Sequence, residues 1–174
     1  MRALFISENY LRTNFNISEN LQSQFIIPAI RNAQFIKYQA IVGTDLYKRL
    51  EDGIMEEDLN DDEKELLEMS KPFIAYSAIV DLVVTTNVKI DNIGVNITSD
   101  ERVNTLGVKD MFQIKDYYQH KADFYCMALQ NFIFNNKEKY PELSECQCRK
   151  IKSNLYSAAT CGLNLGGPRG KIRR

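Results

Sequence analysis

Apolar residues recur at steps of three and four over residues 109–139, which is the spacing of one face of an α-helix. The stripe consists of Met111, Ile114, Tyr118, Ala122, Tyr125, Leu129 and Phe132, and Phe112, Phe124, Ile133 and Phe134 widen it. The stretch contains no Pro or Gly, and roughly 30 helical residues form a rod about 45 Å long. A stripe this broad must be buried, so we expect the other helices to pack on this one.

Three shorter helical patterns precede the long one. They cover 21–42, where Pro28 predicts a kink or a new first turn, then 46–55 after the expected stop at Gly43, and then 63 to about 86. Pro72 lies inside the third pattern and predicts a bend or a boundary between two helices. Residues 5–11 could form a short strand or a first helical turn capped by Ser7. The other candidate N-terminal caps are Ser18, Thr44 or Asp45, and Asp61 or Asp62.

The pattern changes between the third helix and the long one. Over residues 87–107, apolar and polar residues alternate approximately, and Asn92 and Gly94 offer turn chemistry. The apolar members are Val88, Ile90, Ile93, Val95 and Ile97. This alternation predicts a β-hairpin or an extended arm inserted between core helices. An excursion of this length inside a compact domain is often functional.

The sequence therefore predicts a mainly α protein, a helical bundle around the long helix. We expect an N-terminal arm over 1–20, a helical domain over 21–160 and a flexible tail over 161–174. The domain ends with a predicted helix over 143–160, whose weak apolar face is formed by Ile151, Leu155, Ala158 and Ala159. The tail holds four glycines and a proline, so we expect it to become ordered only on a partner.

Composition fits one folded domain, since 44% of the 174 residues are hydrophobic and 26% are charged. The overall net charge of −1 hides an asymmetry. Seven basic residues and no acidic ones lie in 149–174, which leaves 15 basic and 23 acidic residues, a net charge of −8, in the first 148. The tail residues Arg169, Lys171, Arg173 and Arg174 are thus expected to bind DNA phosphates or carboxylates of a neighbouring subunit.

No motif predicts catalysis or a cofactor. Cys146 and Cys148 are spaced too tightly for a usual zinc knuckle, and His120 and Cys126 do not share a helix face. The glycines of the tail are not followed by a Lys-Ser or Lys-Thr pair, so they do not form a phosphate loop. No apolar run is long enough for a membrane span. We therefore expect no enzyme, metal or cofactor site and a protein assembled in a cytoplasm.

Three stretches resemble a known family. They are Ala3–Leu11 (ALFISENYL), Ile41–Leu50 (IVGTDLYKRL) and Pro72–Ala78 (PFIAYSA). Together with the order of the elements, they resemble the head–tail adaptor, or connector, proteins of tailed bacteriophages, as in crAss-like phages that infect Bacteroidetes. Those proteins are small helical domains with a hairpin or long loop between core helices and an extended C-terminal tail.

The resemblance implies a structural protein of the virion head–tail junction. Such adaptors form homo-oligomeric rings, typically of twelve copies, that dock beneath the portal protein, contact other adaptor or tail proteins and surround the passing genomic DNA. In that setting the arm over 87–107 would reach an adjacent subunit or the next ring, and the basic tail would bind the portal or a neighbouring ring.

Two other readings remain open from the residues alone. The first is a small helical nucleic-acid-binding module that uses Arg169–Arg174, which predicts salt-dependent DNA binding that is lost with the tail. The second is an enzyme with a metal at Cys146 and Cys148, which predicts stoichiometric bound zinc or iron in the purified protein.

Overall fold

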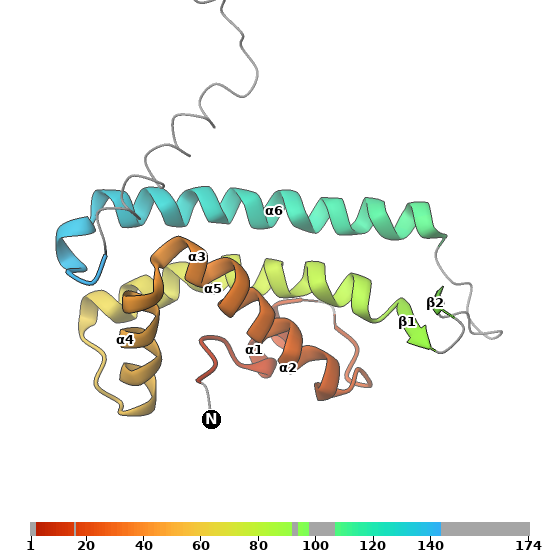
Figure 1. The fold of residues 1–174 in the computed structure, drawn as a ribbon, viewed down its shortest axis with the longest axis horizontal. Coiled ribbons are helices and arrows are strands. Elements are labelled where there is room, and N and C mark those ends of the chain that lie inside the picture. Colours follow the sequence, from red (N-terminus) through yellow and green to blue (C-terminus); the bar gives the residue numbers. More distant parts are fainter. Residues whose placement is uncertain (1–2, 16, 92–93, 98–106, 144–174) are drawn as a thin grey trace, which may run out of the picture.

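The computed structural model describes residues 3–15, 17–91, 94–97 and 107–143, and for residues 89–91 and 94–97 only the backbone. This part of the chain is mainly α-helical, as predicted (Figure 1). The helical elements are α1 (Glu8–Asn14), α2 (Ser23–Asn32), the π-helix η1 (Ala33–Tyr38), α3 (Gln39–Val42), α4 (Thr44–Met55), α5 (Asp61–Thr85), α6 (Val108–Asn135) and the 3-10 helix η2 (Lys137–Lys139). The two long helices α5 and α6 lie side by side, and the shorter helices cover α5.

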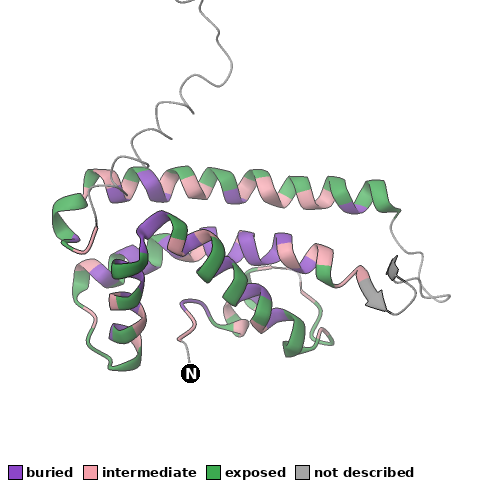
Figure 2. Cartoon of the chain, in the orientation of Figure 1, coloured by how far each residue is buried: buried purple, intermediate pink, exposed green. Residues whose placement is uncertain are grey.

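The centre of the fold is α5, not α6, so the prediction that the other helices pack on the long helix is wrong. Twelve residues of α5 are buried but only five of α6, and Figure 2 shows the difference along both helices. The reason is that α5 is enclosed by α6 on one side and by α2 and η1 on another. A helix buried on several sides has no single apolar stripe, so its pattern is less conspicuous than that of α6.

The long helix α6 is buried along a narrower face than its sequence suggested. Ile133 is fully buried and Phe134 packs partly against the core. Phe112 and Phe124, however, are 48% and 61% exposed, so they do not widen the buried stripe. They lie outside the arc of α6 that contacts α5, because a helix packed against one principal neighbour buries only one side.

The segment predicted as one helix over 21–42 is a run of three, α2, η1 and α3. It begins at Ser23 after Gln22, so Ser18 is not its cap, and α2 continues through Pro28 without a new first turn. Gly43 ends the run, as predicted, with a φ of 87° that favours glycine. Because Gly43 itself precedes α4, neither Thr44 nor Asp45 caps that helix.

A capping box opens α5. The side chain of Asn60 accepts the Glu63 N–H at 2.7 Å, and Glu63 Oε2 accepts the Asn60 N–H at 2.8 Å. Asp61 and Asp62 therefore lie inside the helix and are not its cap. The helix runs through Pro72 as a single element to Thr85.

The N-terminal segment packs on the helical body. Ser7 caps α1, as predicted, by accepting the Tyr10 N–H at 3.1 Å. The ring of Phe5 lies 5.6 Å from that of Tyr38 and 5.1 Å from that of Tyr47, between centroids. Residues 3–11 are thereby fixed against η1 and α4.

Two strands follow α5. β1 (Val88–Asp91) pairs antiparallel with β2 (Gly94–Ile97), with Val88 opposite Ile97 and Ile90 opposite Val95. The prediction for residues 98–106, the predicted helix over 143–160 beyond Leu143 and the basic tail lie outside the described residues.

Candidate interaction site

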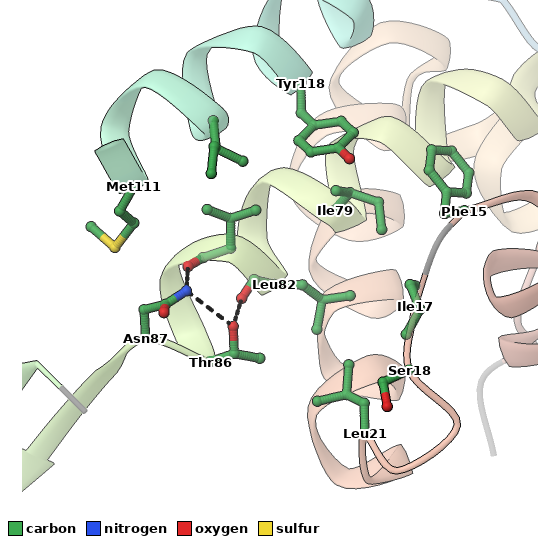
Figure 3. Close-up of a pocket in the computed structure, with 12 residues that line it drawn as sticks. Phe15, Ile17, Ser18, Leu21, Ile79, Leu82, Thr86, Asn87, Met111 and Tyr118 are labelled. Atoms are coloured by element: carbon green, nitrogen blue, oxygen red, sulfur yellow. Dashed lines mark hydrogen bonds between the residues drawn. The ribbon is translucent and has the colours of Figure 1, made fainter. Parts of the chain in front are cut away.

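An apolar groove lies where the end of α5, the start of α6 and the segment between α1 and α2 meet (Figure 3). It has a volume of about 360 Å³. Its lining residues are Phe15, Ile17, Ser18, Leu21, Ile79, Leu82, Val83, Thr86, Asn87, Met111, Ile114 and Tyr118. Because Asn87 directly precedes β1, the groove lies at the base of the two-stranded arm.

One wall of the groove is held by Arg12. Its guanidinium donates to the Leu21 carbonyl at 2.5 Å and to the Ser18 carbonyl at 2.8 Å, which ties the segment between α1 and α2 to α1. Arg12 is itself paired with Glu8 at 2.6 Å, and Glu8 also accepts the Ser23 hydroxyl. The hydrogen bonds from Arg12 and Ser23 lower the pKa of Glu8.

The polar side chains that follow α5 in the groove, Thr86 and Asn87, form hydrogen bonds inside the protein. The Thr86 hydroxyl donates to the Leu82 carbonyl at 2.7 Å, and the Asn87 amide donates to the Val83 carbonyl at 2.7 Å (Figure 3). The Leu82 carbonyl also accepts the Thr86 backbone N–H at 3.0 Å, so both side chains help to close the last turn of α5. Most of the residues that line the groove are apolar, which suits binding of apolar side chains.

An aromatic cluster adjoins the groove. Tyr76 of α5 stacks on Tyr125 of α6 at 5.3 Å and meets Phe15 edge-to-face at 5.0 Å. The Lys121 ammonium lies 4.4 Å from the centroid of Tyr117, and its hydrogen bond to that tyrosine raises the pKa of Lys121. Tyr117 is exposed, whereas Tyr125 is half-buried.

The candidate metal residues are only partly described. Cys126 is a half-buried free thiol whose pKa is raised by burial, and His120 is exposed. Within the described ranges, no three His, Cys, Asp or Glu side chains are grouped to hold a metal ion. Cys146 and Cys148 lie outside those ranges.

The predicted partner-binding residues are placed unevenly. Val88, Ile90, Val95 and Ile97 lie in the paired strands, whereas Ile93 is outside the described residues, as are Arg169, Lys171, Arg173 and Arg174. The groove itself was not predicted. Its α6 residues belong to the predicted helical stripe, but Phe15 and Ile17 lie where the sequence predicts only an N-terminal arm.

A family model described as a family of unknown function, DUF6712, matches residues 38–153. The chain belongs to this family. The DUF6712 region starts at the end of η1 and includes α4, α5, the arm and α6, so it contains two of the three segments that line the groove. No curated protein and no solved structure matches the chain. Among the helices of the described part, none is long and apolar enough to cross a membrane.

Proposed function

We propose that this chain is a structural, non-enzymatic subunit of a head-to-tail connector ring in a tailed bacteriophage. The ring, typically of twelve copies, docks beneath the portal protein, extends the DNA channel and joins the capsid to the tail. In this proposal the protein is assembled in the host cytoplasm and resides at the head–tail junction of the virion. The observation that carries the proposal is the two-stranded arm beside an open apolar groove.

The arm is suited to contacts between subunits. In the observed register, Val88 pairs with Ile97 and Ile90 pairs with Val95, so apolar residues lie opposite apolar residues. The other positions of the two strands are polar or glycine. A lone two-stranded hairpin is marginal in water unless another element packs on it. An arm from one copy that packs into the groove of the next copy would supply that element.

A contact between an arm and a groove joins two different surfaces of the same chain. Such a head-to-tail contact generates a closed ring when the rotation between neighbours divides a full turn. Each copy then contributes one arm and one groove, so every subunit makes two contacts. Weak individual contacts become strong in a closed ring, because they hold the same subunits simultaneously.

Charge favours a second contact through the tail. Residues 51–68, in the second half of α4, its following loop and the start of α5, hold ten acidic residues and one basic residue, Lys64. The tail residues Arg169, Lys171, Arg173 and Arg174 have the opposite sign. We propose that these tail residues bind the portal or an acidic surface of a neighbouring ring. The acidic body would repel DNA sliding through the channel.

The same charge imbalance favours one alternative, a helical nucleic-acid-binding module that uses the basic tail. The alternative predicts that the isolated monomer binds duplex DNA and that binding weakens steeply with salt. Changing the four tail cations to serine would abolish that binding.

The test is single-particle mass measurement and negative-stain microscopy of the full-length protein, alone and with the portal protein of the same virus. We expect rings, either alone or on the portal. The variant Ile90→Asp with Val95→Asp should fail to form them, because it puts two charges at one apolar cross-strand pair. The matched control, Lys89→Ser with Asn96→Ser, alters the neighbouring pair and should form rings normally.

Two outcomes would contradict the proposal. Rings that form equally well with both variants would rule out the arm as the contact. A chain that stays monomeric with the portal but binds DNA through its tail would favour the nucleic-acid module.

A further inference from the structure

The outer side of α6 carries apolar side chains that face away from α5. Tyr117, Phe124 and Met127 are 55%, 61% and 40% exposed. Their spacing of seven and three residues places them on one side of the helix, roughly opposite the buried residues Ala122 and Leu129. We refer to Tyr117, Phe124 and Met127 as the outer face of α6.

The described chain ends at the C-terminal end of α6 (Figure 1). After α6 the chain turns through η2, and Tyr140 is buried with its hydroxyl donating to the Asp62 carbonyl at 3.1 Å. The Leu143 N–H then bonds to the Tyr140 carbonyl at 3.1 Å, and Leu143 packs partly against the core. The turn is therefore fixed at the C-terminal end of α6, and residues 144–174 start from there.

The sequence that follows is amphipathic. Residues 144–160 contain no Pro or Gly, and their apolar and small residues recur at helical steps. These residues are Cys148, Ile151, Leu155, Ala158 and Ala159, which share about a quarter of the circumference of a helix. The positions opposite them, such as Arg149 and Ser153, are polar. Such a segment forms a stable helix only when its apolar side is covered.

We propose that residues 144–160 fold back as a helix antiparallel to α6 and cover its outer face. The lengths agree, because 17 helical residues span about 26 Å and the distance along α6 from Asn135 back to Tyr117 is about 27 Å. In this arrangement Leu155 lies at the level of Phe124, since each is 11 residues from the turn. Short connections between antiparallel helices are common in helical proteins.

This docking determines where the basic tail begins. The helix would end near the start of α6, which is the end of the molecule where the two-stranded arm lies (Figure 1). Arg169–Arg174 would then extend from the same end as the arm, and not from the acidic end formed by residues 51–68. The docking itself requires no ring, so it can be tested on the monomer.

The first test is disulfide trapping in the full chain with Cys126, Cys146, Cys148 and Cys161 changed to alanine. Phe124→Cys combined with Leu155→Cys should form an intramolecular disulfide under mild oxidation, detected by peptide mass. The matched control combines Phe124→Cys with Ser153→Cys, because Ser153 lies on the polar side of the predicted helix. We expect the first pair to react about tenfold faster or more, since only its sulfurs are close. Equal rates would overturn the proposal, and so would a disulfide that joins two copies.

The second test is a double-mutant cycle on the full chain without added cysteines. Phe124→Ser and Leu155→Ser remove the two sides of one contact, so their shifts in melting temperature should be non-additive. Phe112→Ser is the control, because Phe112 is similarly exposed but lies beyond the reach of residues 144–160. Its shift should add to that of Leu155→Ser. Additive shifts for Phe124→Ser and Leu155→Ser would overturn the proposal.

Discussion

Replacing Gln34 by leucine should weaken the attachment of the N-terminal segment to the helical body. Gln34 is 2% exposed, and its side chain forms hydrogen bonds that connect η1 to the first described residues. Its Oε1 accepts the Phe5 N–H at 3.0 Å, and its Nε2 donates to the Ala3 carbonyl at 3.2 Å. Leucine has a similar volume but can replace neither bond.

The expected cost follows from what remains buried. The Phe5 N–H would stay beside a leucine without a partner, which costs about 1–3 kcal/mol. The Ala3 carbonyl is only half-buried and can bind water, so its loss adds little. We expect a loss of about 2 kcal/mol in the free energy of unfolding, or about 4–8 °C in melting temperature for a domain of this size.

The assay combines urea denaturation with hydrogen exchange of residues 3–11. Gln39→Leu is the matched control in the same helical run, because the Gln39 amide makes only a long, exposed bond of 3.4 Å to the Thr44 hydroxyl. That variant should change stability by less than about 0.5 kcal/mol. If Gln34→Leu also changes the free energy of unfolding by less than about 0.5 kcal/mol and hydrogen exchange at residues 3–11 is unchanged, the Gln34 hydrogen bonds do not hold the segment.

Two further predictions concern ion pairs. Arg49→Met removes the cationic partner of Glu63, which is 3% exposed and which Arg49 contacts at 2.7 and 3.1 Å. This variant should lower the melting temperature far more than Lys64→Met, which breaks the exposed pair with Asp61. Equal shifts in thermal unfolding would contradict this expectation.

Glu8 has a pKa lowered from 4.5 by Arg12 and Ser23, so its stabilising effect is complete above about pH 4.5 and is lost as the pH falls through the lowered pKa. The difference in melting temperature between the native chain and Glu8→Gln should therefore shrink from pH 6 to pH 3, and a constant difference would show that the charge of Glu8 is not responsible.

Local sequence signals were reliable where a single segment decides the outcome. Residues 108–135 form one helix because their apolar spacing continues without Pro or Gly. Ser7 caps α1 because a hydroxyl at that position reaches an N–H three residues on. Gly43 ends α3 because its φ of 87° suits glycine. The prediction named Asp61 or Asp62 as the cap of α5, but the cap is Asn60, because all three residue types suit that position and only the actual start of the helix distinguishes them.

The sequence by itself determined the mainly helical class, the long helix and the interruption after α5. Only the tertiary structure decided that α5 is central, that Phe112 and Phe124 are exposed, and that a groove exists. The groove joins Phe15 and Leu21 with Leu82 and Met111, which are far apart in the chain. Helical periodicity records which side of a helix is apolar, but not how many neighbours enclose it. Contacts between distant segments depend on packing in three dimensions, and so they leave no local pattern in the sequence.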